Sequence, residues 1–88
     1  MNIKILGPGC ARCQQMEKTA IEVVKELGID ATVEEIKDMS KIIAYNVMMT
    51  PGLVIDEQVV SSGKVPTKAE VTQLITNALA KEDQQKGS

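Results

Sequence analysis

The sequence contains no histidine, tryptophan or phenylalanine, and Tyr45 is its only aromatic residue. Without histidine there is no imidazole for general acid–base catalysis, no Cys–His nucleophile pair and no histidine metal ligand. A single aromatic cannot form the stacking platform that binds single-stranded nucleic acid. The net charge of −2 gives no electrostatic attraction to a polyanion. We therefore expect no nucleic-acid partner.

Long apolar runs are also missing. No stretch approaches the roughly 20 residues that span a bilayer, and the chain does not open with the basic and apolar segments of a secretory signal. These absences predict a cytoplasmic protein with no membrane partner. The 88 residues are enough for one domain, which we place at residues 1–81. Residues 82–88 are polar without an apolar face, so we expect a disordered tail there.

The two cysteines lie in one short segment, Gly7-Pro8-Gly9-Cys10-Ala11-Arg12-Cys13. A branched aliphatic run, Asn2–Leu6, precedes this segment and predicts a strand. A helical stripe follows it, with apolar residues at steps of three and four up to a terminating Gly28: Cys13, Met16, Ala20, Val23, Val24 and Leu27. A Cys-x-x-Cys at a strand-to-helix junction is typical of a thiol–disulfide site.

The whole chain predicts an α/β fold. Strands and helices alternate as βαβ, α, ββ, α, over residues 2–6, 11–28, 29–36, 38–47, 53–56, 59–62 and 67–79. A βαβ unit has parallel strands, and the last two strands form an antiparallel hairpin. We expect a four-stranded mixed sheet with helices on both faces.

Lys4 and two methionines do not fit the simple pattern. Lys4 interrupts the first strand, and we expect its stem to lie along an edge or end of the sheet with its amine in water. Met48 and Met49 precede Thr50-Pro51, and we expect them to fill or cover the core, with contact to substrate as the alternative.

The chemistry of the cysteine pair follows from its position. Only a thiolate attacks a disulfide, and the N–H groups and dipole of a helix N-terminus stabilise negative charge on Cys10. The nearby charge of Arg12 adds to this effect. Cys13 lies one helical turn later on the same face and begins the apolar stripe, so we expect it to be the more buried thiol. Cys10 is then the nucleophile and Cys13 the resolving thiol.

These residues resemble a known family. Cys10–Cys13 after a first strand, with Thr50-Pro51 before a third, is similar to the thioredoxin/glutaredoxin superfamily, and most of all to its small redox-active disulfide proteins of archaea and bacteria. The resemblance covers residues 2–80 and implies a thioredoxin-like fold. It implies that Pro51 is cis beside the disulfide and that the Thr50 backbone pairs with an extended substrate segment. Gly63 matches the family's glycine near the same site.

The same resemblance implies a dithiol–disulfide oxidoreductase that reduces protein disulfides. Its partners would be disulfide-containing proteins and a thioredoxin-reductase-type electron donor. We expect a monomer with no metal or organic cofactor beyond the Cys10–Cys13 disulfide. The chain departs from the family in lacking Trp-Cys-Gly-Pro-Cys and an evident buried core acid. Gly63 is followed by Lys64-Val65-Pro66, so the glutathione-binding signature is incomplete.

Three alternatives remain for the cysteine pair. A metallochaperone-like domain would use both thiolates for a soft metal such as Cu(I), Zn or Hg. Such domains usually carry Met where this chain has Pro8, and their βαββαβ order differs from the order predicted here. Two thiolates also do not complete a tetrahedral site. The other two alternatives are inert packing of both cysteines and a non-catalytic interaction module.

Overall fold

The structure is a computed structural model that describes residues 1–9 and 11–86, with side chains up to residue 81. Its elements are, in chain order, β1 (Asn2–Leu6), α1 (Ala11–Leu27), β2 (Thr32–Ile36), α2 (Met39–Ala44), β3 (Gly52–Ile55), β4 (Gln58–Ser62) and α3 (Lys68–Lys86). This is the order that the sequence predicts.

The four strands form one mixed sheet in the order β2-β1-β3-β4. β1 and β2 are parallel, with Ile3 opposite Val33, whereas β3 pairs antiparallel with both β1 and β4. The parallel βαβ unit and the antiparallel hairpin are therefore confirmed. β1 lies inside the sheet between β2 and β3. The loop after β1, which leads to the two cysteines, therefore starts at the end of an interior strand.

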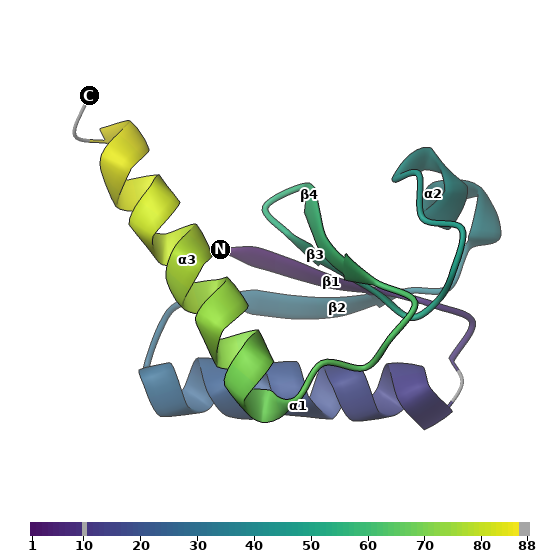
Figure 1. Ribbon diagram of the computed structural model, residues 1–88, viewed down its shortest axis with the longest axis horizontal. Helices are drawn as coiled ribbons and strands as arrows, with labels where there is room; N and C mark the ends of the chain where they lie inside the picture. Colours follow the sequence, from purple (N-terminus) through teal and green to yellow (C-terminus); the bar gives the residue numbers. More distant parts are fainter. Residues whose placement is uncertain (10, 87–88) are drawn as a thin grey trace.

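The helices cover both faces of the sheet, as predicted (Figure 1). On one face, α1 and α3 pack over β1 and β3 in the larger core, whose fully buried residues are Ile3, Ile5, Cys13, Met16, Ala20, Val23, Leu53, Ile55, Val71 and Ile75. On the other face, α2 packs through Ile42 in a smaller core with Leu6, Val47 and Val54. No helix within the described part of the chain is both long and apolar enough to cross a membrane.

Local sequence signals explain where the helices begin and end. Gly28 follows α1 with a φ of 64°, the left-handed conformation that suits a glycine after a helix. The Asp38 carboxylate accepts a hydrogen bond from the Ser40 amide at the start of α2. Thr67 and Glu70 form the predicted capping box of α3, each side chain accepting a hydrogen bond from the other residue's amide at 3.2 Å.

The structure differs from the sequence predictions around α2 and in the length of α3. Ile43, expected on the apolar face of α2, is 64% exposed. α3 continues to Lys86, into the segment for which we expected a disordered tail. Lys, Glu and Gln have high helix propensity, which favours continuation of the helix into this segment. The domain boundary at residue 81 stays a prediction.

Candidate functional site

The loop that carries the first cysteine joins the end of β1 to the start of α1. The Gly7 amide donates a hydrogen bond to the Ile36 carbonyl at 2.9 Å, which extends the pairing of β1 with β2 by one residue. Gly9 has a φ of 89°, a conformation that a glycine adopts without steric cost. α1 begins at Ala11, directly after Cys10 in the chain. Cys10 itself lies outside the described residues, so its role as nucleophile stays a prediction.

Cys13 is fully buried in the larger core, next to the Gly7 backbone. A Cβ added at Gly7 would overlap the Cys13 sulfur and would lie 3.8 Å from the Thr50 Cβ. The second cysteine, the loop after β1 and the segment before β3 therefore meet at one place. The burial agrees with the prediction that Cys13 begins the apolar stripe of α1.

The three predicted substrate-binding residues also lie together. The peptide bond between Thr50 and Pro51 is cis, and Pro51 is buried. The Gly63 amide donates a hydrogen bond to the Pro51 carbonyl at 3.0 Å. Gly63 has a φ of 78°, and a Cβ added there would lie 3.3 Å from the Met49 Cβ. Thr50, Pro51 and Gly63 thus form one cluster, in which Pro51 is buried and Thr50 and Gly63 are half-buried. Gly7 lies between Thr50 and Cys13.

Two charged side chains beside this loop were missed by the sequence analysis. A Cβ added at Gly9 would lie 3.3 Å from the Lys37 Cε and 3.5 Å from the Glu35 Oε1. That carboxylate oxygen is buried and has no hydrogen-bond partner among the residues that the structure describes. Glu35 is paired with Ile5 in the sheet and so belongs to the face that α1 covers. The sequence could have indicated this, because Glu35 is a charged residue at a position of the strand where the alternation predicts an inward side chain.

Glu17 on α1 completes this group of charges. Its pKa is raised, first by the side-chain interaction with the Glu35 carboxyl, then by burial and by repulsion from the Glu35 charge, while Lys37 opposes the shift. Glu35 and Lys37 therefore lie against Gly9, the residue that precedes Cys10, and Glu17 interacts with Glu35. The electric field of these three side chains acts on any thiolate that forms in the loop between β1 and α1.

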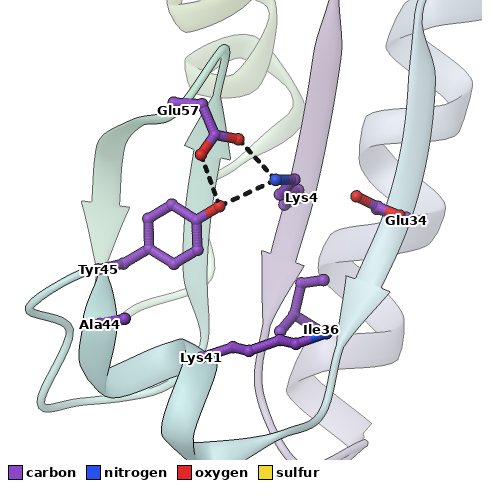
Figure 2. Close-up of a pocket in the computed structure, with 7 residues that line it drawn as sticks. All are labelled: Lys4, Glu34, Ile36, Lys41, Ala44, Tyr45 and Glu57. Carbon is purple, nitrogen blue, oxygen red and sulfur yellow. Dashed lines mark hydrogen bonds and ion pairs between the residues drawn. The ribbon is translucent and has the colours of Figure 1, made fainter.

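A separate polar network lies on the α2 side of the sheet (Figure 2). The Lys4 amine donates to the Tyr45 hydroxyl at 2.9 Å and to Glu57 at 2.5 Å, and the Tyr45 hydroxyl donates to Glu57 at 2.9 Å. These hydrogen bonds, led by the one between Lys4 and Glu57, raise the pKa of Lys4 and lower that of Glu57. We expected the Lys4 stem to lie along an edge or end of the sheet with its amine in water. That expectation is wrong, because β1 is an interior strand and the amine has two protein partners.

The network borders a shallow pocket of about 510 Å³. Its lining residues are Lys4, Glu34, Ile36, Lys41, Ala44, Tyr45 and Glu57. None of these is Cys13, Thr50, Pro51 or Gly63. Within the network, three segments of the chain are joined: the middle of β1, the residue after α2 and the turn between β3 and β4.

Comparison with known proteins gives a consistent result. A family model described as a thioredoxin domain matches residues 1–76. A protein named thioredoxin from Methanothermobacter thermautotrophicus is 45% identical over 76 residues, covering 86% of this chain and 99% of that relative. Another protein named thioredoxin, from Methanocaldococcus jannaschii, is 35% identical over 77 residues, covering 88% of each chain.

Proposed function

This chain belongs to the thioredoxin family, and on that premise we propose that it reduces protein disulfides, with Cys10 as the nucleophile and Cys13 as the resolving thiol. The observation that carries the proposal is the position of Cys13. Its sulfur is buried against Gly7 and near Thr50, at the end of β1 where α1 begins. A resolving thiol needs this place, near the first cysteine and shielded from other disulfides.

The reaction is a pair of thiol–disulfide exchanges. The Cys10 thiolate attacks one sulfur of the substrate disulfide, that S–S bond breaks, and the departing substrate thiolate takes up a proton from water. The Cys13 thiol loses its proton and its sulfur attacks Cys10, which breaks the mixed disulfide and releases the second substrate thiolate. The substrate gains two electrons, and the protein keeps an intramolecular disulfide.

Local electrostatics would favour the first step. The first turn of an α-helix has backbone N–H groups without intrahelical partners and the positive end of the helix dipole, and α1 begins directly after Cys10 in the chain. The Lys37 amine lies beside Gly9, close enough to add positive charge. Each lowering of the thiol pKa by one unit corresponds to about 1.4 kcal/mol in favour of the thiolate.

The partners would be disulfide-containing proteins and a thioredoxin-reductase-type donor that returns two electrons to the disulfide. The cluster of Thr50, Pro51 and Gly63 would hold an extended stretch of the substrate protein beside the two cysteine sulfurs. We propose a cytoplasmic monomer with no bound cofactor, because a reducing compartment supplies the electrons that such a carrier passes on.

A turnover assay tests the proposal. The protein is incubated with dithiothreitol and insulin, and reduction of the insulin disulfides is followed over time. Cys10→Ser is expected to abolish the catalysed rate and Cys13→Ser to lower it severely, while Lys81→Gln, an exposed change on α3, leaves it intact. Full activity in the Cys10→Ser variant would refute the proposal. Tight stoichiometric binding of Cu(I) or Zn without turnover would instead favour the metallochaperone alternative.

A further inference from the structure

Two adjacent methionines project from the segment between α2 and β3. The side chain of Met48 is 97% exposed and that of Met49 is 67% exposed. The expectation that they fill or cover the core is wrong. Met48 buries almost none of its surface, so packing gives no reason for a methionine at this position.

Exposure decides which thioethers react with peroxides. A hydroperoxide transfers one oxygen atom to the methionine sulfur, so the sulfur becomes a sulfoxide and the peroxide becomes water or an alcohol. Hydrogen peroxide reaches Met48 and Met49 from solvent. Met16, on the buried stripe of α1, is 0% exposed and provides an internal comparison within the same chain.

The fold should tolerate oxidation at the two exposed positions. The sulfoxide oxygen of an oxidised Met48 would remain in water, with its hydrogen bonds satisfied there. The same group on Met16 would lie in the larger core among apolar side chains, where a polar atom without a partner is destabilising. Oxidation at Met48 and Met49 would therefore change the surface and leave the core intact.

This surface borders the candidate site. Met49 is followed directly by Thr50-Pro51, and its Sδ lies 3.7 Å from the position of a Cβ added at Gly63. The Gly63 amide in turn donates to the Pro51 carbonyl. A sulfoxide on Met49 would thus place a polar group beside two of the three residues proposed to hold substrate.

We propose that Met48 and Met49 are the sites at which hydroperoxides preferentially modify this protein, and that their conversion to sulfoxides weakens the docking of protein substrates. The second half rests on the proposed function. The apolar thioethers contact the substrate next to its disulfide, and the sulfoxides must lose water to make the same contact. The modification is reversible, because methionine sulfoxide reductases restore the thioether.

Peptide mass spectrometry tests the site assignment without reference to thiol chemistry. The disulfide form of the protein is exposed to a graded series of hydrogen peroxide, quenched, reduced with dithiothreitol and digested. Met48 and Met49 are expected to gain oxygen first. Met39, which is 53% exposed, should be oxidised no faster than they are, and Met16 should be oxidised last. Oxidation of Met16 at the rate of Met48 would overturn the assignment.

Kinetics on the same samples test the effect on docking. After oxidation and reduction by dithiothreitol, the wild-type protein is expected to show a roughly five-fold rise in KM for insulin, the factor given by a small penalty for burying a polar group. The Met48→Leu/Met49→Leu variant should keep its KM after peroxide, whereas Met39→Leu should respond as the wild type does. An unchanged KM in wild-type protein oxidised at both methionines would refute the docking effect. The Cys10→Ser assay, which tests the proposed function, is independent of the mass spectrometric result.

Discussion

The Cys13 sulfur occupies the space that a side chain on Gly7 would need. Gly7→Ala must therefore displace Cys13 or the end of β1, and forcing a methyl group into packed surroundings costs about 1–3 kcal/mol. Equilibrium denaturation in urea measures the loss. Gly28→Asn is the matched control, because nothing lies within 4 Å of a Cβ there and asparagine tolerates the left-handed conformation. Equal stability of Gly7→Ala and the wild type would show that the contact is absent.

The pairing of Glu17 with Glu35 predicts a pH-dependent loss of stability. The folded-state pKa of Glu17 is raised, so the folded protein binds a proton that the unfolded chain releases more readily. Stability is then full below the ordinary carboxyl pKa and falls as pH rises through the raised value. Glu17→Gln should make the protein more stable than the wild type at pH 7, with the difference disappearing at about pH 3, below the ordinary carboxyl pKa.

Thermal unfolding of both proteins across this pH range measures the effect. Gln15→Ala, an exposed change on the same helix that removes no ionisable group, is the control and should differ from the wild type by the same amount at pH 3 and pH 7. A Glu17→Gln difference that is the same at pH 3 and pH 7 would mean that the two carboxyl groups do not interact.

The hydrogen bonds of Glu57 to Lys4 and Tyr45 predict the opposite dependence. They lower the pKa of Glu57, so their contribution to stability is present above the ordinary carboxyl pKa and is lost as pH falls through the lowered value. Glu57→Gln should be less stable than the wild type at pH 7 and similar to it at low pH. A double-mutant cycle with Lys4→Met isolates the pair, and additive losses would argue against a direct interaction.

The burial of Cys13 predicts unequal reactivity of the two thiols. In the reduced protein, iodoacetamide should label Cys10 first, with an apparent pKa below the ordinary thiol value of about 8.5. Cys13 is fully buried and should react only on slower opening of the structure. Mass spectrometry of peptides sampled over time, from pH 5 to pH 10, gives both rates. Faster labelling of Cys13 would reverse the assigned roles.

The elements with strong local signals could be predicted from the sequence. The apolar stripe from Cys13 to Val23 has the period of a helix buried on one side, and these positions are buried in α1. The capping box from Thr67 to Glu70 identified the start of α3 because both reciprocal hydrogen bonds are local.

Features that depend on long-range contacts could not be predicted. Lys4 was misplaced because its own strand does not reveal that β1 lies between β2 and β3. Its partners, Tyr45 and Glu57, are far away in sequence. Met48 and Met49 are apolar residues in a loop, where no periodic pattern distinguishes an exposed side chain from a buried one.

The candidate site divides in the same way. The spacing of the cysteines and the Thr50-Pro51 step predicted its main parts, of which Cys13 and Thr50 both lie near Gly7. The proximity of Lys37 and Glu35 to Gly9 depends on how the end of β2 folds past the loop after β1, which no short motif encodes.

Capture of a mixed disulfide tests the central claim most directly. The Cys13→Ser and Cys10→Ser variants are each incubated with a disulfide-containing protein, and intact mass spectrometry counts covalent adducts. If Cys10 attacks and Cys13 resolves, Cys13→Ser accumulates a stable adduct through Cys10, and Cys10→Ser forms almost none. Adducts that accumulate on Cys13 in the Cys10→Ser variant, with none on Cys10 in the other, would contradict the account.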